Sequence, residues 1–164
     1  MVTIFRLLHI KMFDTEYYRQ HTDHFQSKAL NDIPSFVYIR NKIQAKPKEK
    51  ILDAGCGTGY LLDFVTSNQS YGYGIDISPI AIKEAKKKYP RFSFQKGSLL
   101  KLPYKNNFFD KVYSFNVIEH IENQDLAIKE LMRVLKPGGI IVLGTNDKNS
   151  LSWKLFCLFY GGDP

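Results

Sequence analysis

Short apolar segments alternate with longer amphipathic segments from about residue 50 to residue 146. The short apolar runs predict β-strands at 50–54, 71–76, 92–97, 110–117 and 139–146. Apolar positions at helical spacing predict α-helices between them, at about 59–68, 79–89 and 123–135. Strands that alternate with helices indicate an α/β fold, in which right-handed crossovers build a parallel sheet that is covered on both faces. Ligands of such sheets bind beyond the carboxyl ends of the strands, so the residues after each strand are the first candidates for a site.

The third predicted helix has a one-sided apolar pattern, which is expected to pack on the sheet. Its apolar face consists of Leu126, Ile128, Leu131, Met132 and Leu135. A Lys-Pro-Gly-Gly breaker at 136–139 is expected to end this helix before the last strand begins.

The N-terminal part of the chain has a different pattern. Residues 13–44 are polar and aromatic with helical spacing, Pro34 suits the first turn of a helix, and a lysine-rich breaker follows at 46–50. We therefore expect a helical cap or lid over residues 1–47 and a core domain over 48–147. The third segment, 148–164, is expected to be an apolar helix or a truncated remainder. The first residues are interrupted by charges, and we interpret them as an amphipathic leader, or as untranslated sequence if Met12 is the start.

Composition narrows the class of protein only a little. The chain has 164 residues, 44% of them hydrophobic, and a formal net charge of +7, which is typical of a single soluble domain that tolerates an acidic partner. RNA or an anionic membrane surface therefore remains a candidate partner, although lysine runs are more often solvated helix faces. No basic stripe interleaved with aromatic residues is present, and we expect no DNA partner. Cys56 and Cys157 form neither a metal-ligand spacing nor a disulfide framework, so we expect no metal and a cytoplasmic location.

A glycine-rich segment, Asp-Ala-Gly-Cys-Gly-Thr-Gly at 53–59, follows the first predicted strand. Glycines at 55, 57 and 59 permit positive φ and a close approach of the backbone to a ligand, although a purely structural tight turn is the alternative. A phosphate loop would need Gly-Lys-Ser/Thr, and a dinucleotide fingerprint would need glycine where Tyr60 stands. Both of these classes are therefore excluded.

Two aspartates suggest the chemistry of the ligand. Asp53 would repel a pyrophosphate but suits an ammonium or sulfonium group. Asp76 ends the second predicted strand, where a carboxylate can accept hydrogen bonds from both ribose hydroxyls, and Ile77 offers an apolar face to a base. The alternative is that Asp76 is an N-cap or turn residue before the next helix, but Ser78 is better placed to cap it.

Four blocks in this order resemble the class I S-adenosylmethionine-dependent methyltransferases, in particular groups that act on small molecules. The blocks are ILDAGCGTG, GYGIDISPIAIKEAKKK, FQKGSLLKLPYKNNFFDKVYSFNVIEHI and ELMRVLKPGGIIVLGTN. The resemblance covers about residues 48–147. It implies a Rossmann-like doubly wound parallel sheet in the order 3-2-1-4-5, with S-adenosylmethionine as the cofactor.

The resemblance also implies which residues hold the cofactor. They are Asp53, Ala54, Gly55, Gly57, Gly59, Asp76, Ile77, Ser98, Leu99 and Asn116. The residues from Asp53 to Gly59 would surround the methionine half, Asp76 the ribose, and Ile77 the adenine. Asn116 would approach the methionine moiety, and the Leu99 N–H would face the ring. Ser98 stands where many relatives have an aspartate that accepts a hydrogen bond from the adenine amino group. The serine hydroxyl can accept the same hydrogen bond, but it carries no negative charge to strengthen it.

Candidate proton acceptors follow the fourth predicted strand. Glu119 and His120 lie on the substrate side of such sites, where an imidazole can take a proton from an oxygen or nitrogen nucleophile. The alternative is that His120 packs structurally and Glu119 is a surface acid. Asn146 and Asp147 are further candidate substrate contacts. The segments typical of exocyclic-amine and cytosine-C5 DNA methylases are missing, so we expect a small-molecule or lipid-like acceptor.

Two regions outside the four blocks bear on activity. Aromatic and histidine side chains of the cap are expected to select the substrate, with the cap closing over the cofactor as a lid. The alternative is that they pack the cap onto the sheet. They are Tyr17, Tyr18, His21, His24 and Phe25. The family sheet normally adds an antiparallel pair after the fifth strand, for which residues 150–164 show no pattern. The fifth strand would then be an open edge that residues 150–160 or a second copy of the chain covers, or the sequence is truncated. A non-catalytic binding module, a truncated inactive methyltransferase and an RNA methyltransferase remain alternatives.

Overall fold

The structure is a computed structural model and describes residues 34–144. Its elements, in chain order, are α2 (Pro34–Ile43), β1 (Lys50–Ala54), α3 (Tyr60–Val65), β2 (Tyr71–Asp76), α4 (Pro79–Lys88), β3 (Ser93–Lys96), β4 (Phe109–Phe115), the 3-10 helix η2 (Ile118–His120), α5 (Gln124–Val134) and β5 (Leu135–Gly144). The predicted lid aromatics, Asn146, Asp147, Cys157, the leader and the segment 148–164 lie outside the described residues.

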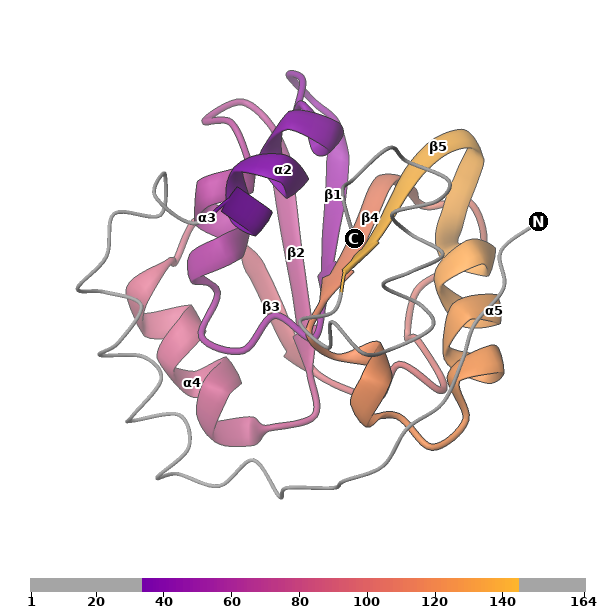
Figure 1. The fold of residues 1–164 in the computed structure, drawn as a ribbon. Helices are drawn as coiled ribbons and strands as arrows, with labels where there is room; N and C mark the ends of the chain where they lie inside the picture. Colours follow the sequence, from indigo (N-terminus) through magenta and orange to yellow (C-terminus); the bar gives the residue numbers. More distant parts are fainter. Residues whose placement is uncertain (1–33, 145–164) are drawn as a thin grey trace.

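The five strands form one sheet with the order β3-β2-β1-β4-β5, and each neighbouring pair is parallel. This arrangement confirms the predicted fold class and strand order. Figure 1 shows the strands running in one direction, so that the segments following β1, β2 and β4 meet at the same edge of the sheet. The register places Asp53 of β1 opposite Gly74 of β2 and Tyr113 of β4.

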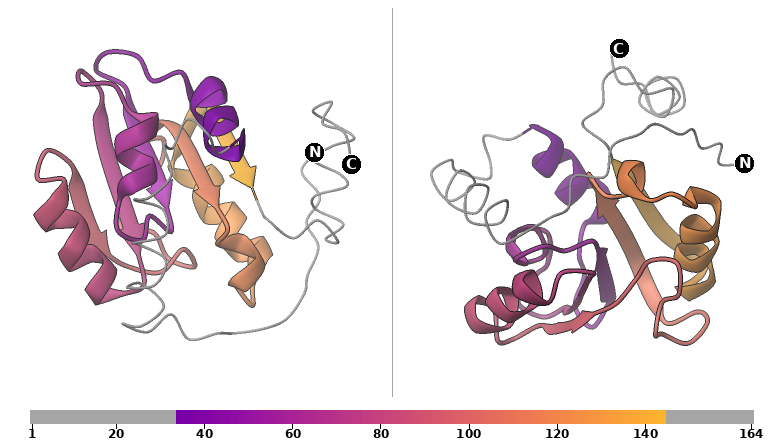
Figure 2. Two further views of the ribbon diagram at one scale, coloured as in Figure 1. Left: turned by 60° about the vertical axis from the view of Figure 1, so that its left-hand side comes forward. Right: turned by 90° about the horizontal axis from the view of Figure 1, so that it is seen from below.

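Helices cover both faces of the sheet (Figure 2), and an apolar core lies on each face. On one face, α2, α3 and α4 contribute buried side chains such as Phe36, Leu62 and Ile82, which pack against Ile51 of β1. On the other face, α5 and the segment between β3 and β4 cover Leu52 and its neighbours. Within the predicted cap, α2 is therefore packed on the sheet through Phe36, Ile39 and Ile43.

The buried face of α5 differs from the prediction. Leu126 and Met132 are 40% and 48% exposed, so assigning them to the packing face was wrong. The face that packs on the sheet consists of Gln124, Ala127, Ile128, Leu131 and Val134. These residues repeat at intervals of three and four, which keeps one continuous stripe on a helix, and this stripe includes a small and a polar residue.

Several predicted boundaries also shift. The helix expected at 59–68 is shorter, because Thr66 adopts an extended conformation (φ −84°, ψ 153°) and ends α3 at Val65. The breaker at 136–139 follows α5 as expected. It lies within the last strand and not before it, because β5 already starts at Leu135. A register shift between Phe109 and Lys111 accommodates the extra residues, and Pro137 is tolerated because β5 ends the strand order of the described sheet.

A polar clamp fixes the segment between β3 and β4 onto α5. The Arg133 guanidinium donates to the carbonyl oxygens of Leu102 and Tyr104 and to the Glu130 carboxylate, at distances of 2.7–2.9 Å. Glu130 in turn accepts a hydrogen bond from the Leu102 N–H at 2.7 Å. Because the segment is tied down here, the residues that precede it, including Ser98 and Leu99, are held at the carboxyl end of β3.

Candidate active site

The glycine turn, defined as residues 55–59, leaves β1 and leads into α3. Gly55, Gly57 and Gly59 all have positive φ, at 89°, 50° and 83°, as predicted from their spacing. The N–H groups of Gly55 and Cys56 donate to the Ile75 carbonyl oxygen at 2.8 and 3.0 Å, which fixes the turn beside the end of β2. The turn therefore has a defined backbone conformation that most other residue types would strain.

Gly55 also brings the turn against the segment that follows β4. A Cβ atom added at Gly55 would lie 2.2 Å from Val117 Cγ2, which is far closer than two carbon atoms can approach. The backbone of the turn and the side chain of Val117 are thus in direct contact. Sequence reasoning missed Val117, because only the sheet order brings together two residues so far apart in the chain.

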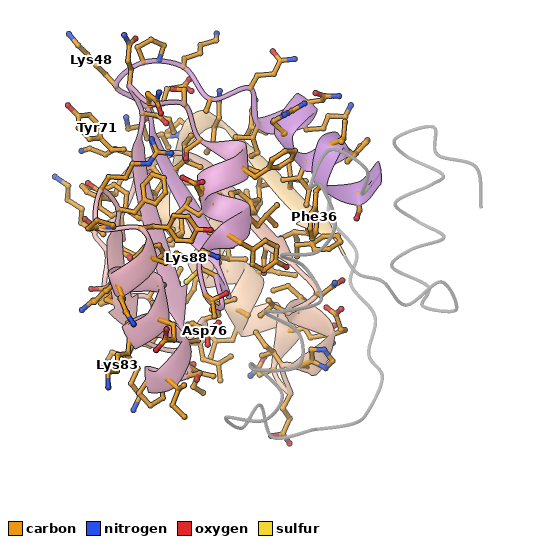
Figure 3. All side chains as sticks on the ribbon, turned by 90° about the vertical axis from the view of Figure 1, so that its left-hand side faces the viewer. Phe36, Lys48, Tyr71, Asp76, Lys83 and Lys88 are labelled. Atoms are coloured by element: carbon orange, nitrogen blue, oxygen red, sulfur yellow. The ribbon has the colours of Figure 1, made fainter. Side chains whose placement is uncertain are left out.

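Asp76 joins the end of β2 to the glycine turn and to α4. Its two carboxylate oxygens accept hydrogen bonds from the N–H groups of Gly57 and Ser78, each at 2.8 Å. Ser78 is the N-cap of α4, and its hydroxyl accepts from the Ala81 N–H at 3.2 Å, so the prediction that Ser78 caps this helix is confirmed. Asp76 is 6% exposed, whereas the neighbouring Ile77 is 65% exposed; Figure 3 shows Asp76 near the start of α4.

Asp53 is a buried acid behind the turn, with 2% of its surface exposed. The Tyr113 hydroxyl donates to its Oδ2 atom at 2.9 Å. Burial raises the pKa of Asp53 to about 8; the tyrosine hydrogen bond opposes this rise, and the charge of Asp76 adds to it. At neutral pH the carboxyl is therefore mostly protonated, and a cation placed beside it would favour the ionised form.

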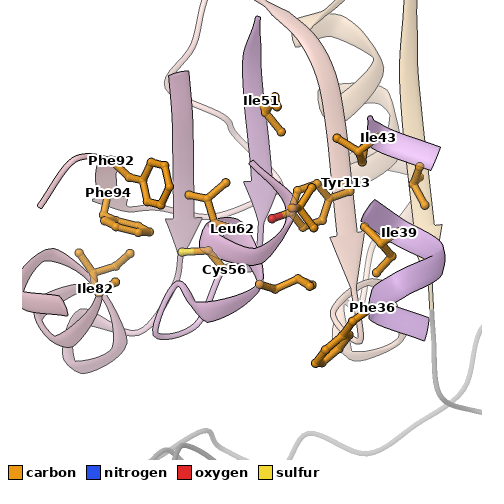
Figure 4. Packing of buried hydrophobic residues seen from close by; sticks show 14 residues of the cluster. Phe36, Ile39, Ile43, Ile51, Cys56, Leu62, Ile82, Phe92, Phe94 and Tyr113 are labelled. Atoms are coloured by element: carbon orange, nitrogen blue, oxygen red, sulfur yellow. The ribbon is translucent and has the colours of Figure 1, made fainter. Parts of the chain in front are cut away.

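Tyr113 lies within the apolar core on the side of α2 and α3 (Figure 4). It is fully buried, as is its hydrogen bond to Asp53, and burial raises the pKa of its phenol well above the usual value. Sequence reasoning missed Tyr113 because its role depends on the register that sets it opposite Asp53. Cys56 is also buried there, and burial raises the pKa of its thiol.

Ser98 and Leu99 follow β3 next to the Asp76 backbone. The Gly97 N–H donates to the Asp76 carbonyl oxygen at 2.9 Å, and the Ser98 hydroxyl accepts from the Leu100 N–H at 3.1 Å. The Leu99 side chain is buried in the core on the α5 side. The Ser98 hydroxyl thus stabilises a local turn and keeps acceptor capacity for a further partner.

Asn116 follows β4 in the left-handed conformation, with φ of 56°, which asparagine adopts more readily than most residues other than glycine. Its N–H donates to the Gly144 carbonyl oxygen at 2.9 Å. Its Oδ1 atom is buried and accepts no hydrogen bond from any residue in the described range 34–144. A buried acceptor of this kind is uncommon and costly, which makes the atom a candidate to receive a hydrogen bond from a ligand.

Glu119 and His120 lie on η2, directly beyond Asn116 and Val117. Glu119 is partly buried, whereas His120 is exposed. The His120 N–H donates to the Val117 carbonyl oxygen at 3.0 Å, which links η2 to the residue that contacts the glycine turn. Asp53, Asp76, Asn116 and these two residues thus come from segments that converge at one edge of the sheet.

Two searches of residues 34–144 add to this picture. No group of three or more His, Cys, Asp or Glu side chains in this range is arranged to hold a metal ion. In the same range, we find no helix with the length and apolar character that a membrane span requires.

Comparison with known proteins gives the family of the chain. The family described as "Methyltransferase domain" matches residues 52–143, which contain the glycine turn, Asp76 and all strands except the first residues of β1 and the last of β5. The chain therefore belongs to this family, and its strand order and glycine turn are those expected for the class I S-adenosylmethionine-dependent methyltransferases.

Individual relatives show how widely the family has diverged. The chain is 33% identical over 135 residues to norajmaline N-methyltransferase of Rauvolfia serpentina, covering 77% of this chain and 45% of that protein. It is 33% identical over 101 residues to demethylmenaquinone methyltransferase of Streptomyces griseus, covering 62% and 44%. The crystal structure of the [4+2]-cyclase SpnF matches with a TM-score of 0.61 and 30% identity, covering 65% of this chain and 42% of that one. The chain thus spans less than half the length of these relatives.

Proposed function

We propose that this protein binds S-adenosylmethionine at the carboxyl edge of its sheet and transfers the methyl group to a small-molecule or lipid-like acceptor. The observation that carries the proposal is the position of the Asp76 carboxylate, which lies between the glycine turn and α4 beside the exposed Ile77. A carboxylate has about four lone-pair positions, so Asp76 can accept ribose hydroxyls while it keeps its two backbone partners.

The other residues fit the cationic half of this cofactor. The Asn116 Oδ1 atom is a buried acceptor without a partner among the described residues, which suits an ammonium N–H. The protonated Asp53 becomes an ionised partner when a positive charge arrives nearby. The absence of side chains at Gly55 and Gly59 lets the turn pack directly against Val117 and Phe94, which holds its backbone in a fixed position at the edge of the proposed site.

The residues of the chain divide the work of the proposed reaction. The cofactor supplies a methyl group already activated by its sulfonium. The chain then has to bind both reactants, hold the acceptor in line with that group and exclude water. Glu119 and His120 are the proposed proton acceptors, because they extend from the segment that contacts the glycine turn.

Titration calorimetry with S-adenosylmethionine and S-adenosylhomocysteine tests the binding step. We expect the wild type to bind both and Asp76→Asn to bind about tenfold to a hundredfold more weakly, because hydrogen bonds to an ionised group are lost. Ser78→Ala is the matched control, since it removes the α4 cap but leaves Asp76 in place. Failure of the wild type to bind would refute the cofactor proposal, and full affinity of Asp76→Asn would refute the ribose role.

The proton acceptors are tested by turnover. With a panel of phenols and amines as acceptors, formation of S-adenosylhomocysteine is expected to fall about a hundredfold or more in His120→Gln. Affinity for the cofactor should stay unchanged in this variant. Glu119→Gln is the companion variant, and undiminished rates in both variants would exclude the two residues as proton acceptors.

The second candidate is a domain that binds the cofactor without methyl transfer. It is favoured by one observation, namely that a protein of this fold named as a [4+2]-cyclase is 30% identical to the chain. Binding in the calorimeter without turnover on any acceptor would support this candidate. An RNA methyltransferase has only the positive net charge in its favour.

A further inference from the structure

The outward face of α4 carries lysines beside exposed aliphatic side chains. Ala81, Ile82 and Ala85 form the buried side of this helix. Ile80, Lys83 and Lys87 follow one another at helical spacing on the opposite side, and Lys86 flanks them. α4 begins directly after Ser78, whose N–H donates to Asp76, so the first turn of the helix adjoins the candidate active site.

The charges of this face are not neutralised by the fold. Within residues 34–144, the ion pairs of the structure involve Arg91, Lys111, Arg133 and Lys136, and none involves a lysine of α4. Glu84 is the one acidic residue in α4. The face therefore has a clear excess of positive charge that is available to an anionic partner.

An apolar side chain at the N-terminal end of α4 indicates the type of partner. Ile80, in the first turn of α4, is 39% exposed and precedes the lysines in sequence. A surface that binds single-stranded RNA would be expected to offer aromatic rings for stacking. Branched aliphatic side chains next to lysines instead suit an interface where hydrocarbon and phosphate lie side by side.

We propose that α4 docks the protein on anionic lipid bilayers, with Ile80 entering the headgroup region and Lys83, Lys86 and Lys87 beside the phosphates. The carboxyl edge of β2, with Asp76, would then lie next to the bilayer surface. Together with the proposed function, on which this step rests, the docking favours an acceptor that resides in the membrane over one that diffuses in water.

Vesicle flotation with the full chain tests the docking. We expect binding to vesicles that contain phosphatidylglycerol, weak binding to pure phosphatidylcholine vesicles, and weakening by salt. Each lysine near an anionic surface contributes about fivefold in binding, so the α4 triple variant Lys83→Gln, Lys86→Gln, Lys87→Gln is expected to bind about a hundredfold more weakly. The matched control changes three exposed lysines elsewhere, Lys42→Gln, Lys46→Gln and Lys129→Gln, and should bind like the wild type. Ile80→Ser is expected to weaken binding to the same vesicles several-fold at any salt concentration.

The outcomes separate the docking from the proposed function. Equal losses in the α4 and control variants would overturn the docking surface, as would a wild type that ignores anionic vesicles. Binding of an RNA oligonucleotide without vesicle binding would also overturn it, in favour of a nucleic-acid partner. In calorimetry, the α4 variant should bind S-adenosylmethionine with the affinity of the wild type. Loss of cofactor binding and loss of membrane binding are therefore distinguishable.

Discussion

The Asp53→Asn variant is expected to gain stability relative to the wild type by on the order of 5 kcal/mol as the pH rises from 4 to 8. In the folded protein the Asp53 carboxyl is buried and its pKa is about 8, whereas an exposed aspartate has a value of 3.8. About four pKa units, at roughly 1.4 kcal/mol each, give the size of the effect. The asparagine keeps the shape of the side chain and an acceptor for Tyr113 but does not titrate.

The direction of the change in stability with pH follows from proton uptake on folding. Between these two pKa values the unfolded chain is ionised at Asp53 while the folded protein still holds the proton, so folding requires proton binding. Stability of the wild type therefore falls as the pH rises through this window, and it is unaffected by this group below about pH 4.

Urea unfolding at a series of pH values measures this difference. Glu84→Gln, which removes a carboxylate from the exposed face of α4, is the control variant in the same series. A constant difference between Asp53→Asn and the wild type would show that the buried carboxyl is ionised in the folded protein. On the proposed function, the more stable variant also binds the cofactor less well, because it offers no negative charge to the ammonium or sulfonium group.

Gly55→Ala is expected to destabilise the protein by about 3 kcal/mol and to weaken cofactor binding with it. Two separate costs combine. A positive φ costs an L-residue about 1–2 kcal/mol, and the new methyl group would overlap Val117 at 2.2 Å, which forces a shift in a packed region.

Gly138 is the matched control for the conformational part. It also has a positive φ, 76°, but a Cβ atom there would meet nothing within 4 Å. Gly138→Ala should therefore cost about 1 kcal/mol. Adding Val117→Ala to Gly55→Ala should recover much of the extra loss in a double-mutant cycle. Equal unfolding free energies for the two alanine variants would show that the methyl group added at residue 55 does not clash with Val117.

The parts of the fold that could be predicted are those written locally in the sequence. The alternation of apolar runs with helical spacing indicated each strand, and the turn residues indicated where Asp76 would lie. The buried face of α5 was predicted incorrectly, because large apolar residues were counted while Ala127 and Gln124, which are buried, were not. The start of β5 was also placed too late, because a Pro-Gly-Gly sequence usually breaks structure, yet an end strand tolerates it.

The site was predictable to the extent that it depends on single segments. Asp76 and the glycine turn come from consecutive elements, and their contact follows from the βαβ order. Tyr113 and Val117 could not be found, because their contacts with Asp53 and Gly55 depend on the register of β4 against β1. A pattern in one sequence carries no information about which residues stand opposite each other on strands so far apart.

The same separation affects how the site is assembled during folding. The bond between Asp76 and Gly57 closes a loop of 19 residues, whereas the bond between Tyr113 and Asp53 closes one of 60. Loop-closure entropy grows with the logarithm of length, so the second contact is about 1 kcal/mol harder to nucleate than the first. The ribose side of the proposed site is therefore favoured to form early from local contacts, and the side that faces the acceptor is completed only when β4 adds to β1.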